Sequence, residues 1–388
     1  MALVPFSYNL RSLRVRKSAT LLTVISVGAT VAIFAGVLAL QQGFETLFTE
    51  AGRDDVAIFL RPGAISEGES GFPRDKTEII KKSLPEIAVS NGAPLASSES
   101  FLAVRRRKLD GGETNVPIRG VEQQTFTIRE DELSVIEGRR FNAGTDEVIV
   151  GERLVGRIQG CQLGETILLN TTPFKVVGVF SHEGPFASEI WGDVARMAQA
   201  LERPFYSRVV AVLKPGVDIE DLALRLSEHK EVPAKVLGER EYYSGQTRAL
   251  STILRGLGTF LALVMGTAAV FTATNTMLSA LSTRSYEIGI LLSLGFRPFS
   301  IFLSFLFESV LLSLAGGLVG ISAAFLINGV ETGTTNFQTF TEIAFAFRVT
   351  PTVLTQAVSF SLALGLIGGA WPAWRAARMK PVEALRRH

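Results

Sequence analysis

The placement of long uncharged stretches constrains this chain more than any other feature. No residue from Ser18 to Phe44 is charged, and three more long apolar runs lie in the last third of the sequence. Each run can cross a bilayer, which takes about 20 apolar residues in a helix. Roughly 200 residues of water-soluble character separate the first run from the other three. The pattern therefore predicts a one-plus-three arrangement of spans with one large aqueous domain.

The predicted fold class is an α-helical membrane protein with four transmembrane helices and a large α+β extracytoplasmic domain. The predicted spans cover residues 18–41, 256–283, 299–330 and 349–374. The aqueous domain, with stalk helices at its ends, covers 42–255, and a short extracytoplasmic loop covers 331–348. Residues 1–17, 284–298 and 375–388 are predicted to be cytoplasmic.

The charges next to the spans predict the orientation of the chain. The net charge is only +2, so no global attraction to nucleic acid is expected. Cations gather instead on one side of the predicted spans, at Arg11, Arg14, Arg16, Lys17, Arg284, Arg297, Arg375, Arg378, Lys380, Arg386 and Arg387. The positive-inside rule then places both termini in the cytoplasm and the large domain outside.

A cleaved signal peptide is the alternative interpretation of the first run, because its flank is basic. Its apolar stretch is longer than the roughly 7–15 residues of a signal peptide, and no clear cleavage site follows it. Cleavage would still leave the large domain outside. The single cysteine, Cys161, cannot form an internal disulfide, so this domain must be stabilised by its own core.

The aqueous domain mixes helical and strand patterns. Helices are predicted at 75–84, capped by Asp75 and stopped by Pro85, and at 152–159, 191–201 and 218–227. Strands are predicted at 54–60, 101–108, 113–121, 147–151, 165–170, 174–180 and 207–213, the second and third joined as a hairpin. The basic run Arg105–Lys108 is interpreted as a solvated face of this hairpin, with contact to a partner or lipid headgroup as the alternative.

The spans carry further local signals. The helical pattern of the first span continues to Glu50, and residues 239–255 lead into the second span without a helix breaker. We therefore predict that these two helices leave the membrane together as a stalk. Pro372 is expected to kink or end the last span. Two small-residue faces serve either general helix packing or a dimer seam; they are formed by Gly316, Gly317, Gly320, Gly365, Gly368 and Gly369.

The sequence lacks several motifs of catalytic sites. It has no G-x-x-x-x-G-K-[ST] phosphate loop, no G-x-S-x-G elbow and no H-E-x-x-H helix. Its three histidines, His182, His229 and His388, are scattered, so a metal site built from them is not expected. We therefore predict that the chain is not an enzyme and binds no cofactor or metal of its own.

The segment between the second and third spans carries the clearest functional signal. Ile288, Leu291 and Leu292 recur at helical spacing between flanking charges, and Gly295 can end this helix. Such an amphipathic helix can lie along lipid headgroups or dock into a groove on a soluble partner. The residues alone leave both possibilities open.

Longer stretches of the chain resemble a known family. Two of them are NTMLSALSTRSYEIGILLSLGFRPFSIFLSFLFESVLLSLAGGLVG and the tail WPAWRAARMKPVEALRRH. They closely resemble signatures of the MacB/FtsX/LolC-type ABC transporter permeases, the type VII or mechanotransmission class. The stretches LSVIEGRRFNAGTDEVIVGERLVGRIQG, GETILL and FKVVGVF are more loosely similar to the extracytoplasmic core domain of that family. The chain is expected to be a split form without the fused ATPase domain that MacB carries.

The resemblance implies roles for particular residues. In this family the segment after the second span is a coupling helix that docks on a separate ATPase, which would bind the ATP and Mg. That role would fall on Arg284, Glu287, Ile288, Gly289, Leu292, Gly295 and Arg297. The tail is expected to join the contact through Arg375, Arg378, Pro381 and Glu383. A second permease copy, identical or paralogous, and a periplasmic adaptor are the other implied partners, in the bacterial inner membrane.

Glu308 is an ionisable residue inside the third span, where such groups are costly and usually functional. We expect it either to pair with a basic residue such as Arg375 or Arg378, or to take part directly in coupling. A proton relay is not expected, because the other spans offer no second acid.

The family divides into efflux pumps, lipoprotein-releasing systems and regulators of cell-wall hydrolases. The large aqueous domain favours the first two, and adaptor-dependent efflux is the first choice. A membrane-anchored ligand sensor belongs to a different class, and it would need a cytoplasmic signalling module that the sequence does not contain.

Overall fold

A computed structural model of the protein describes residues 17–49, 52–336 and 339–385. The chain divides into two compact units. The membrane unit comprises the described residues of 1–43, 251–330 and 346–388, and the head domain comprises those of 44–250 and 331–345. Several cations used to predict the orientation lie outside the described residues; they are Arg11, Arg14, Arg16, Arg386 and Arg387.

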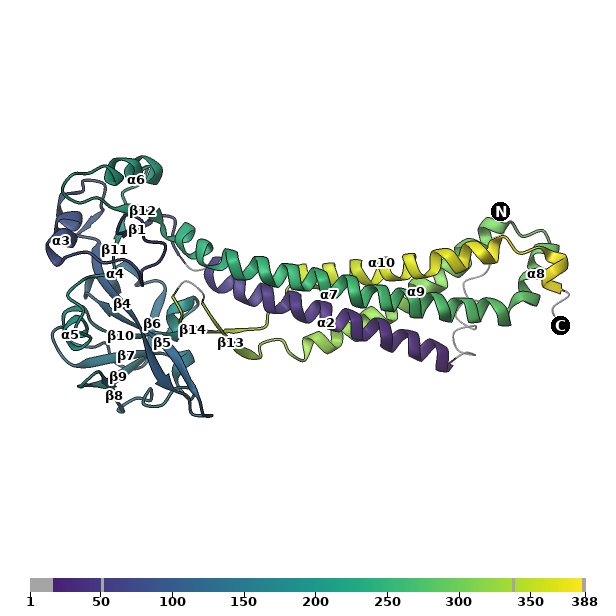
Figure 1. The fold of residues 1–388 in the computed structure, drawn as a ribbon, viewed down its shortest axis with the longest axis horizontal. Helices are drawn as coiled ribbons and strands as arrows, with labels where there is room; N and C mark the ends of the chain where they lie inside the picture. The colour runs from purple at the N-terminus through teal and green to yellow at the C-terminus, as the bar shows by residue number, and fades with distance from the viewer. Residues whose placement is uncertain (1–16, 50–51, 337–338, 386–388) are drawn as a thin grey trace. The chain divides into compact units, whose positions relative to one another are not determined.

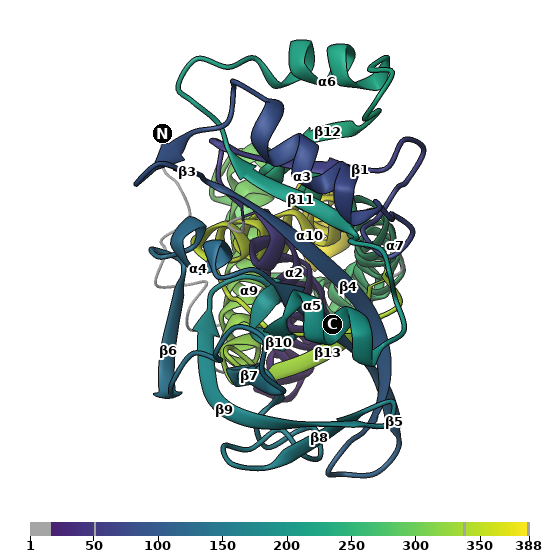
Figure 2. The ribbon, with the colours of Figure 1, turned by 90° about the vertical axis from the view of Figure 1, so that its left-hand side faces the viewer.

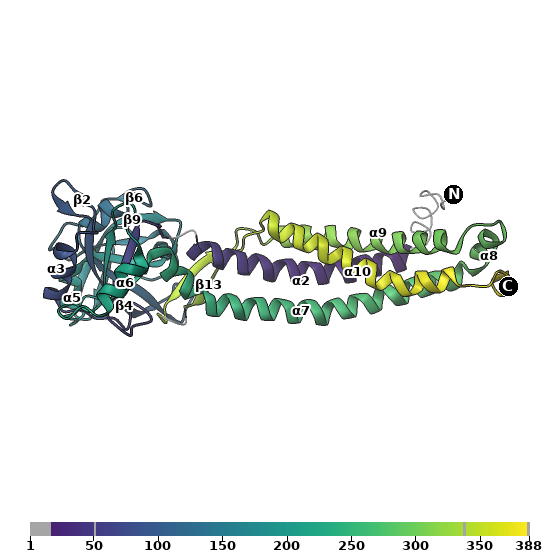
Figure 3. The ribbon, with the colours of Figure 1, turned by 90° about the horizontal axis from the view of Figure 1, so that it is seen from above.

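Four helices among the described residues are long and apolar enough to cross a membrane, in agreement with the predicted spans. They are α2 (Lys17–Thr49), α7 (Glu239–Thr283), α9 (Pro298–Phe325) and α10 (Pro351–Ala377). Within the membrane unit these helices lie side by side (Figures 1 and 3). Two short helices, α8 (Ser285–Ser293) and α11 (Pro381–Leu385), complete this unit.

Small residues let the spanning helices approach closely. A Cβ atom on Gly320 would lie 2.6 Å from the carbonyl oxygen of Gly28 in α2, and one on Gly317 would lie 2.4 Å from the Ser361 hydroxyl in α10. A Cβ atom on Gly368 would meet Ala273 of α7 at 3.0 Å. These glycines therefore serve packing between helices of the same chain, which is the first of the two alternatives predicted for them.

Pro372 does not end α10, which continues to Ala377. A proline removes one backbone donor, so the carbonyl of Gly368 four residues earlier loses its helical partner. The Thr274 hydroxyl of α7 donates to that carbonyl at 2.9 Å. A side chain of a neighbouring helix thus satisfies the freed acceptor, and the helix can continue inside an apolar environment.

The head domain is built on a ten-stranded sheet in the described part of the chain. The strand order is β12-β1-β11-β4-β5-β10-β7-β9-β6, with β8 paired to β9. The strands are β1 (Val56–Leu60), β4 (Ala96–Arg107), β5 (Glu113–Val121), β6 (Leu133–Gly138), β7 (Glu147–Gly151), β8 (Thr166–Leu169), β9 (Thr172–His182), β10 (Ile190–Asp193), β11 (Arg208–Val212) and β12 (Lys235–Gly238). The helices are α3 (Arg74–Ser83), α4 (Gln124–Ile128), α5 (Val194–Ala200) and α6 (Ile219–Ser227), and β2 (Val89–Ser90) pairs with β3 (Ala93–Pro94).

Three helices cover one face of this sheet over two apolar cores (Figure 2). In the first core, α3 and α6 pack on strands β1, β11 and β12. In the second, α5 packs on β5, β7 and β10. Because side chains alternate along a strand, Glu99, Phe101, Arg119 and Arg208 point to the opposite face, where they are fully or nearly fully buried.

The head domain differs locally from the sequence prediction. Trp191 lies in strand β10, and α5 begins only at Val194, where the Asp193 side chain caps the helix. The predicted helix 152–159 is reduced to a 3-10 turn at Glu152–Leu154, followed by Gly156 with φ +74°. Asp75 lies in the first turn of α3 and does not cap it. Strands β2, β3, β6 and β12 were not predicted.

The connection between α9 and α10 is part of the head domain, where the sequence analysis predicted a plain loop. It forms the hairpin β13 (Glu331–Thr335) and β14 (Glu342–Ala346). Glu342 accepts from Lys108 at 2.6 Å and from Arg157 at 2.7 Å. The predicted solvated face Arg105–Lys108 is therefore only partly solvated: Lys108 holds this hairpin, and Arg106 donates to the carbonyl of Leu168.

Candidate functional site

The predicted coupling segment begins at a sharp turn after the second span. Helix α7 ends at Thr283, Arg284 adopts φ −105° and ψ 13°, and α8 starts at Ser285. At its other end Gly295 takes φ +88°, with its N–H donating to the carbonyl of Leu292 at 3.1 Å. The Phe296 N–H donates to the carbonyl of Leu291 at 3.1 Å. This is a Schellman ending, and it agrees with the prediction that Gly295 ends the helix.

A buried ion pair ties the start of α8 to the third span. The Arg284 Nη1 atom donates to Glu308 Oε2 at 2.9 Å, and these residues are 6% and 2% exposed. The guanidinium carbon also lies 5.3 Å from the centre of the Phe305 ring. Glu308 thus pairs with Arg284, and not with Arg375 or Arg378 as the sequence analysis expected. The two roles considered for Glu308, pairing with a cation and coupling to the ATPase, would therefore both be carried by its ion pair with Arg284.

The apolar residues of α8 turn inward. Ile288 is buried against Met277 of α7 and Ile301 of α9, Gly289 is buried, and Leu292 is half-buried against the same cluster. The apolar spacing predicted this stripe, but a single helix cannot reveal that its own neighbours cover it. The face left for a partner consists of Tyr286, Glu287, Ile290 and Leu294. Arg297, at the start of α9, is also exposed.

The tail residues lie at the same end of the membrane unit. Helix α11 packs against α8, and Pro381 is its first residue. The Arg375 and Arg378 guanidinium groups stack over Trp371 and Trp374, with carbon-to-centroid distances of 5.8 and 4.3 Å. Glu383 belongs to α11. The structure therefore brings the predicted coupling and tail segments together.

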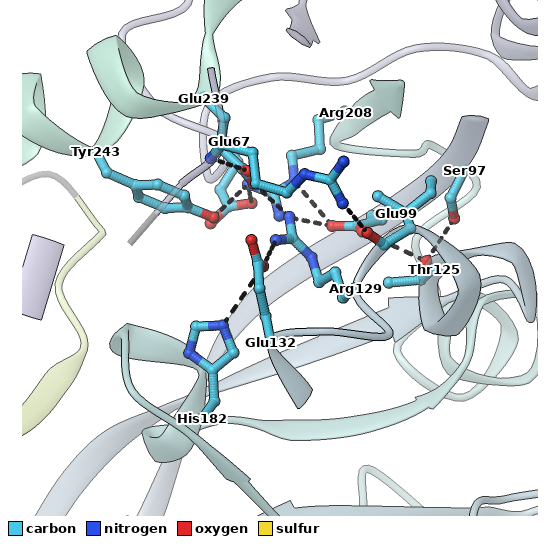
Figure 4. Close-up of polar contacts among 12 residues, drawn as sticks. Glu67, Ser97, Glu99, Thr125, Arg129, Glu132, His182, Arg208, Glu239 and Tyr243 are labelled. Atoms are coloured by element: carbon cyan, nitrogen blue, oxygen red, sulfur yellow. Dashed lines mark hydrogen bonds and ion pairs between the residues drawn. The ribbon is translucent and has the colours of Figure 1, made fainter. Parts of the chain in front are cut away.

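A second group of charges lies inside the head domain, where the sequence analysis assigned no site (Figure 4). We call it the charge cluster; its members are Glu67, Glu99, Arg119, Arg129, Glu132, Glu189, Arg208 and Glu239. Arg119 contacts three carboxylates, those of Glu67 at 2.6 Å, Glu189 at 2.7 Å and Glu99 at 3.1 Å. Arg208 donates from Nε to Glu99 at 2.8 Å. Such buried charges are tolerated because they are paired and hydrogen-bonded.

Strand pairing explains why these residues meet. Arg208 of β11 is directly opposite Glu99 of β4, and Arg119 of β5 is opposite Phe101 of β4. Glu99 and Phe101 are two residues apart, so both point to the same face of the sheet. Trp191, opposite Arg119 on β10, donates from Nε1 to Glu189 at 2.7 Å.

The charge cluster holds the first turn of α7. Glu239, the first residue of that helix, forms an ion pair with Arg129 and accepts from the backbone N–H of Arg53 at 3.1 Å. One turn later, the Tyr242 hydroxyl accepts from the backbone N–H of Glu67 at 3.1 Å. The Tyr243 hydroxyl contacts Arg208 at 3.4 Å. Buried polar contacts therefore join the head sheet to the first two turns of α7.

The electrostatics keep two carboxyls of the cluster, Glu67 and Glu99, ionised. Burial opposes ionisation of Glu67, but the charges of Arg119 and Arg208 overcome it and hold the pKa of this carboxyl below its ordinary value. Burial likewise opposes ionisation of Glu99, and Arg208, Arg119 and Arg129 lower its pKa. Burial raises the pKa of the Tyr243 phenol, which stays neutral and able to hydrogen-bond.

A cavity of about 450 Å³ opens beside the cluster and is lined by acidic residues together with His182. Burial opposes ionisation of Glu132, but the neighbouring His182, 3.8 Å away, and the charge of Arg129 lower the pKa of this carboxyl to about 2. Within the described residues, no group of three or more His, Cys, Asp or Glu side chains is arranged to hold a metal ion.

Sequence reasoning missed the charge cluster, although one signal was present. Glu99, Arg119 and Arg208 each interrupt a segment that otherwise has the composition of a buried strand. A charge in such a segment must find a partner, and three of them in separate strands predict a shared site. The sequence gives no such signal for Glu239, because an acidic residue in the first turn of a helix is common.

Comparison with known families now defines the class of protein. The MacB-like periplasmic core domain matches residues 19–228, and the FtsX-like permease C-terminal domain matches residues 259–381. The chain therefore belongs to the MacB/FtsX family of ABC transporter permeases. It is a permease subunit with four candidate membrane helices and a MacB-like periplasmic core domain.

Relatives of known name agree with this assignment. The chain is 25% identical to the macrolide export ATP-binding/permease protein MacB of Sodalis glossinidius, covering 97% of this chain and 59% of that protein. It is 25% identical to the ABC transporter permease YvrN of Bacillus subtilis, covering 98% of this chain and 97% of that one. A pyoverdine export ATP-binding/permease protein, PvdT of Pseudomonas fluorescens, is 31% identical over 58% of this chain and 34% of its own length.

Solved structures also resemble part of the chain. The extracellular domain of the noncanonic ABC-type transporter YknZ from Gram-positive bacteria is 14% identical, with a TM-score of 0.36 over 47% of this chain and 99% of that one. The periplasmic region of MacB from Actinobacillus actinomycetemcomitans is 13% identical, with a TM-score of 0.35 over 48% of this chain and 90% of that one.

Proposed function

We propose that this permease converts ATP hydrolysis by a separate cytoplasmic ATPase into movement of the periplasmic head domain, in adaptor-dependent efflux. The proposal rests on one observation: α7 is a single helix without a break from Glu239 to Thr283. The charge cluster holds its first turn, and the Arg284–Glu308 pair holds the turn that follows its last residue.

In this mechanism the ATPase contacts the exposed face of α8 and the adjoining α11. ATP and Mg²⁺ are bound by the ATPase, and no residue of this chain takes part in the chemistry. When the ATPase subunits close, α8 is displaced and Arg284 transmits the displacement to α9 and α7. Because buried polar contacts fix the first turns of α7 to the head sheet, the movement of the helix reaches the head domain. The second subunit is another permease copy, and both termini lie in the cytoplasm.

The named relatives support export as the task. MacB is described as a macrolide exporter and PvdT as a pyoverdine exporter, and both carry ATP-binding and permease parts. This chain covers 59% of the MacB relative and 34% of PvdT. YvrN, which is described as an ABC transporter permease, is covered over 97% of its own length. This relative supports the proposal of a separate ATPase subunit, and we propose that a periplasmic adaptor completes the pump.

Exposed leucines at two places provide a matched test of the coupling surface. Leu294 at the end of α8 is 72% exposed, and Leu224 on α6 of the head domain is 71% exposed. The tagged chain is purified from its native membrane with its ATPase, and ATP turnover is measured after reconstitution. Leu294→Glu should abolish the stimulation of turnover by the permease, and Leu224→Glu should leave it intact. Equal stimulation in both variants would remove α8 from the interface.

The proposed role in efflux is tested by identifying the periplasmic proteins that copurify with the same tagged chain. Efflux predicts a membrane-fusion adaptor among them. Recovery of lipoproteins, or of a cell-wall hydrolase, in place of an adaptor would contradict efflux and point to one of the other two tasks of the family.

A further inference from the structure

A cavity of about 340 Å³ lies in the membrane unit between the end of α7 and the end of α10. One side is basic, formed by Arg375, Arg378 and Lys380, and the other is apolar, formed by Leu278 and Leu281. No carboxylate is among the described residues that line it. The volume falls in the range of small-molecule sites, and the charge selects for anions.

The two arginines of this cavity are positioned to bind oxygen atoms. The guanidinium carbon of each lies over the ring of an exposed tryptophan, Arg375 over Trp371 at 5.8 Å and Arg378 over Trp374 at 4.3 Å. Neither forms an ion pair with a described residue. A stacked guanidinium keeps its N–H edge available, and that edge matches two oxygens of a phosphate.

The surroundings place the cavity at the surface of a bilayer. Trp371 and Trp374 are 51% and 48% exposed near the end of a spanning helix, which is where tryptophans mark the headgroup level. Leu278 and Leu281 belong to the last two turns of α7 and line the cavity with apolar side chains. A ligand that fits both sides carries a phosphate and an apolar tail.

We propose that this cavity binds an anionic phospholipid, with the phosphate of the headgroup on Arg375 and Arg378 and the acyl chains along α7. The apolar wall favours a lipid over a soluble phosphate, and a basic pocket between spanning helices is a recognised site for anionic headgroups. The cavity also contains Ser285, the first residue of α8, so the lipid would contact the start of the coupling helix. The proposal requires no ATPase and can fail or stand independently of the proposed function.

The test uses tryptophan fluorescence of the full chain in detergent micelles. Brominated phosphatidylglycerol or brominated phosphatidylcholine is added, and quenching of Trp371 and Trp374 is measured. The third tryptophan, Trp191, is fully buried in the head domain and provides an unquenched background. We expect half-maximal quenching at a concentration of the anionic lipid at least tenfold lower than that of the zwitterionic lipid. Each cation at a membrane surface contributes about a fivefold preference.

Three variants define the outcome. The double variant Arg375→Gln/Arg378→Gln should lose most of the preference. Arg375→Lys/Arg378→Lys, which keeps the charge but not the planar N–H edge, should keep part of it. Arg297→Gln is the matched control, because Arg297 is exposed at the start of α9 and does not line the cavity. Equal quenching by the two lipids in the wild-type chain would overturn the proposal, as would the same loss in Arg297→Gln.

Two further measurements distinguish a lipid site from a site for free phosphate and from a contact with the ATPase. Inorganic phosphate at millimolar concentration should not displace the brominated lipid, and full displacement would contradict a lipid site. A double Gln variant that keeps its lipid preference but no longer copurifies with the ATPase would also overturn the proposal, and would assign the cations to a protein contact.

Discussion

The two ends of α7 meet a buried arginine–glutamate pair in different surroundings. At the head end, Arg129 binds Glu239 and also Glu132, and the cluster continues through further charges. At the membrane end, Arg284 binds the buried Glu308 at 2.9 Å and the half-exposed Glu287 at 3.4 Å. In a cluster, a charge that loses one partner keeps contacts with the others. In a contact between two elements, the stability of each buried charge depends mainly on the opposite charge.

This difference suggests different mechanical roles. The head end is a fixed joint, because several strands and the first turn of α7 share one set of contacts. The membrane end is a junction at which one non-helical residue, Arg284, separates two helices. Conformational change is therefore expected at the α7–α8 turn, and the predictions below test whether the two ends differ in this way.

The largest effect is expected for Glu308→Ala. Removing this buried carboxylate leaves the Arg284 charge inside an apolar unit with the longer contact to the half-exposed Glu287, which costs about 3–5 kcal/mol of stability. The double variant Arg284→Ala/Glu308→Ala should recover part of that loss, because the buried guanidinium is removed together with its carboxylate. Thermal unfolding of the full chain in detergent measures both. A double variant no more stable than the single one would show that the pair does not act as a unit.

Glu239→Ala should cost less, about 1–3 kcal/mol, because Arg129 keeps its hydrogen bond to Glu132 at 2.9 Å. The change should appear as faster hydrogen exchange in the first turns of α7 and in β11. If this variant is destabilised more than Glu308→Ala, the contrast between the two ends is wrong.

Acid should weaken the head end over a defined range of pH. The pKa of Glu132 is lowered to about 2 in the folded protein from an ordinary value of 4.5. A lowered folded pKa contributes stability above the unfolded pKa, and that contribution is lost as pH falls from about 4.5 to about 2. Glu132→Gln should be less stable than the wild-type chain at pH 6, and the difference should shrink towards zero as the pH approaches 2. A constant difference across this range would rule out Glu132 as the titrating group.

The smallest effect is expected for Glu342→Gln in the β13–β14 hairpin. Its partners Lys108 and Arg157 remain about one-third exposed, so solvent can replace the lost ion pairs. We expect a loss of about 1 kcal/mol or less, with faster hydrogen exchange confined to the hairpin. Exchange that also rises in α9 and α10 would indicate that this hairpin restrains the spans.

The membrane unit could be predicted from sequence almost completely, because apolar length and helix-ending residues are local signals. The four spans and the ending at Gly295 follow from them. The Arg284–Glu308 pair could not be predicted, since it depends on which faces of α8 and α9 meet. Family resemblance supplied the role proposed for α8, and it did not indicate the inward orientation of Ile288.

The head domain was harder to predict because its strands pair across long distances in sequence. The hairpin of β4 and β5 follows from its Gly-rich turn, but the pairing of β4 with β11 joins residues more than one hundred positions apart. The charge cluster depends on that pairing. The short segment 191–201 was assigned to a helix because its strand is only four residues long and is continuous with α5.

The burial of Cys161 has a practical consequence for measuring topology. Its side chain is 1% exposed in the head core, and burial raises the pKa of the thiol to about 12. Maleimide reagents attack thiolates, so the native chain should behave as a cysteine-free background. Leu224→Cys and Leu294→Cys would then each report one location, and an impermeant maleimide applied to spheroplasts should label the first and spare the second.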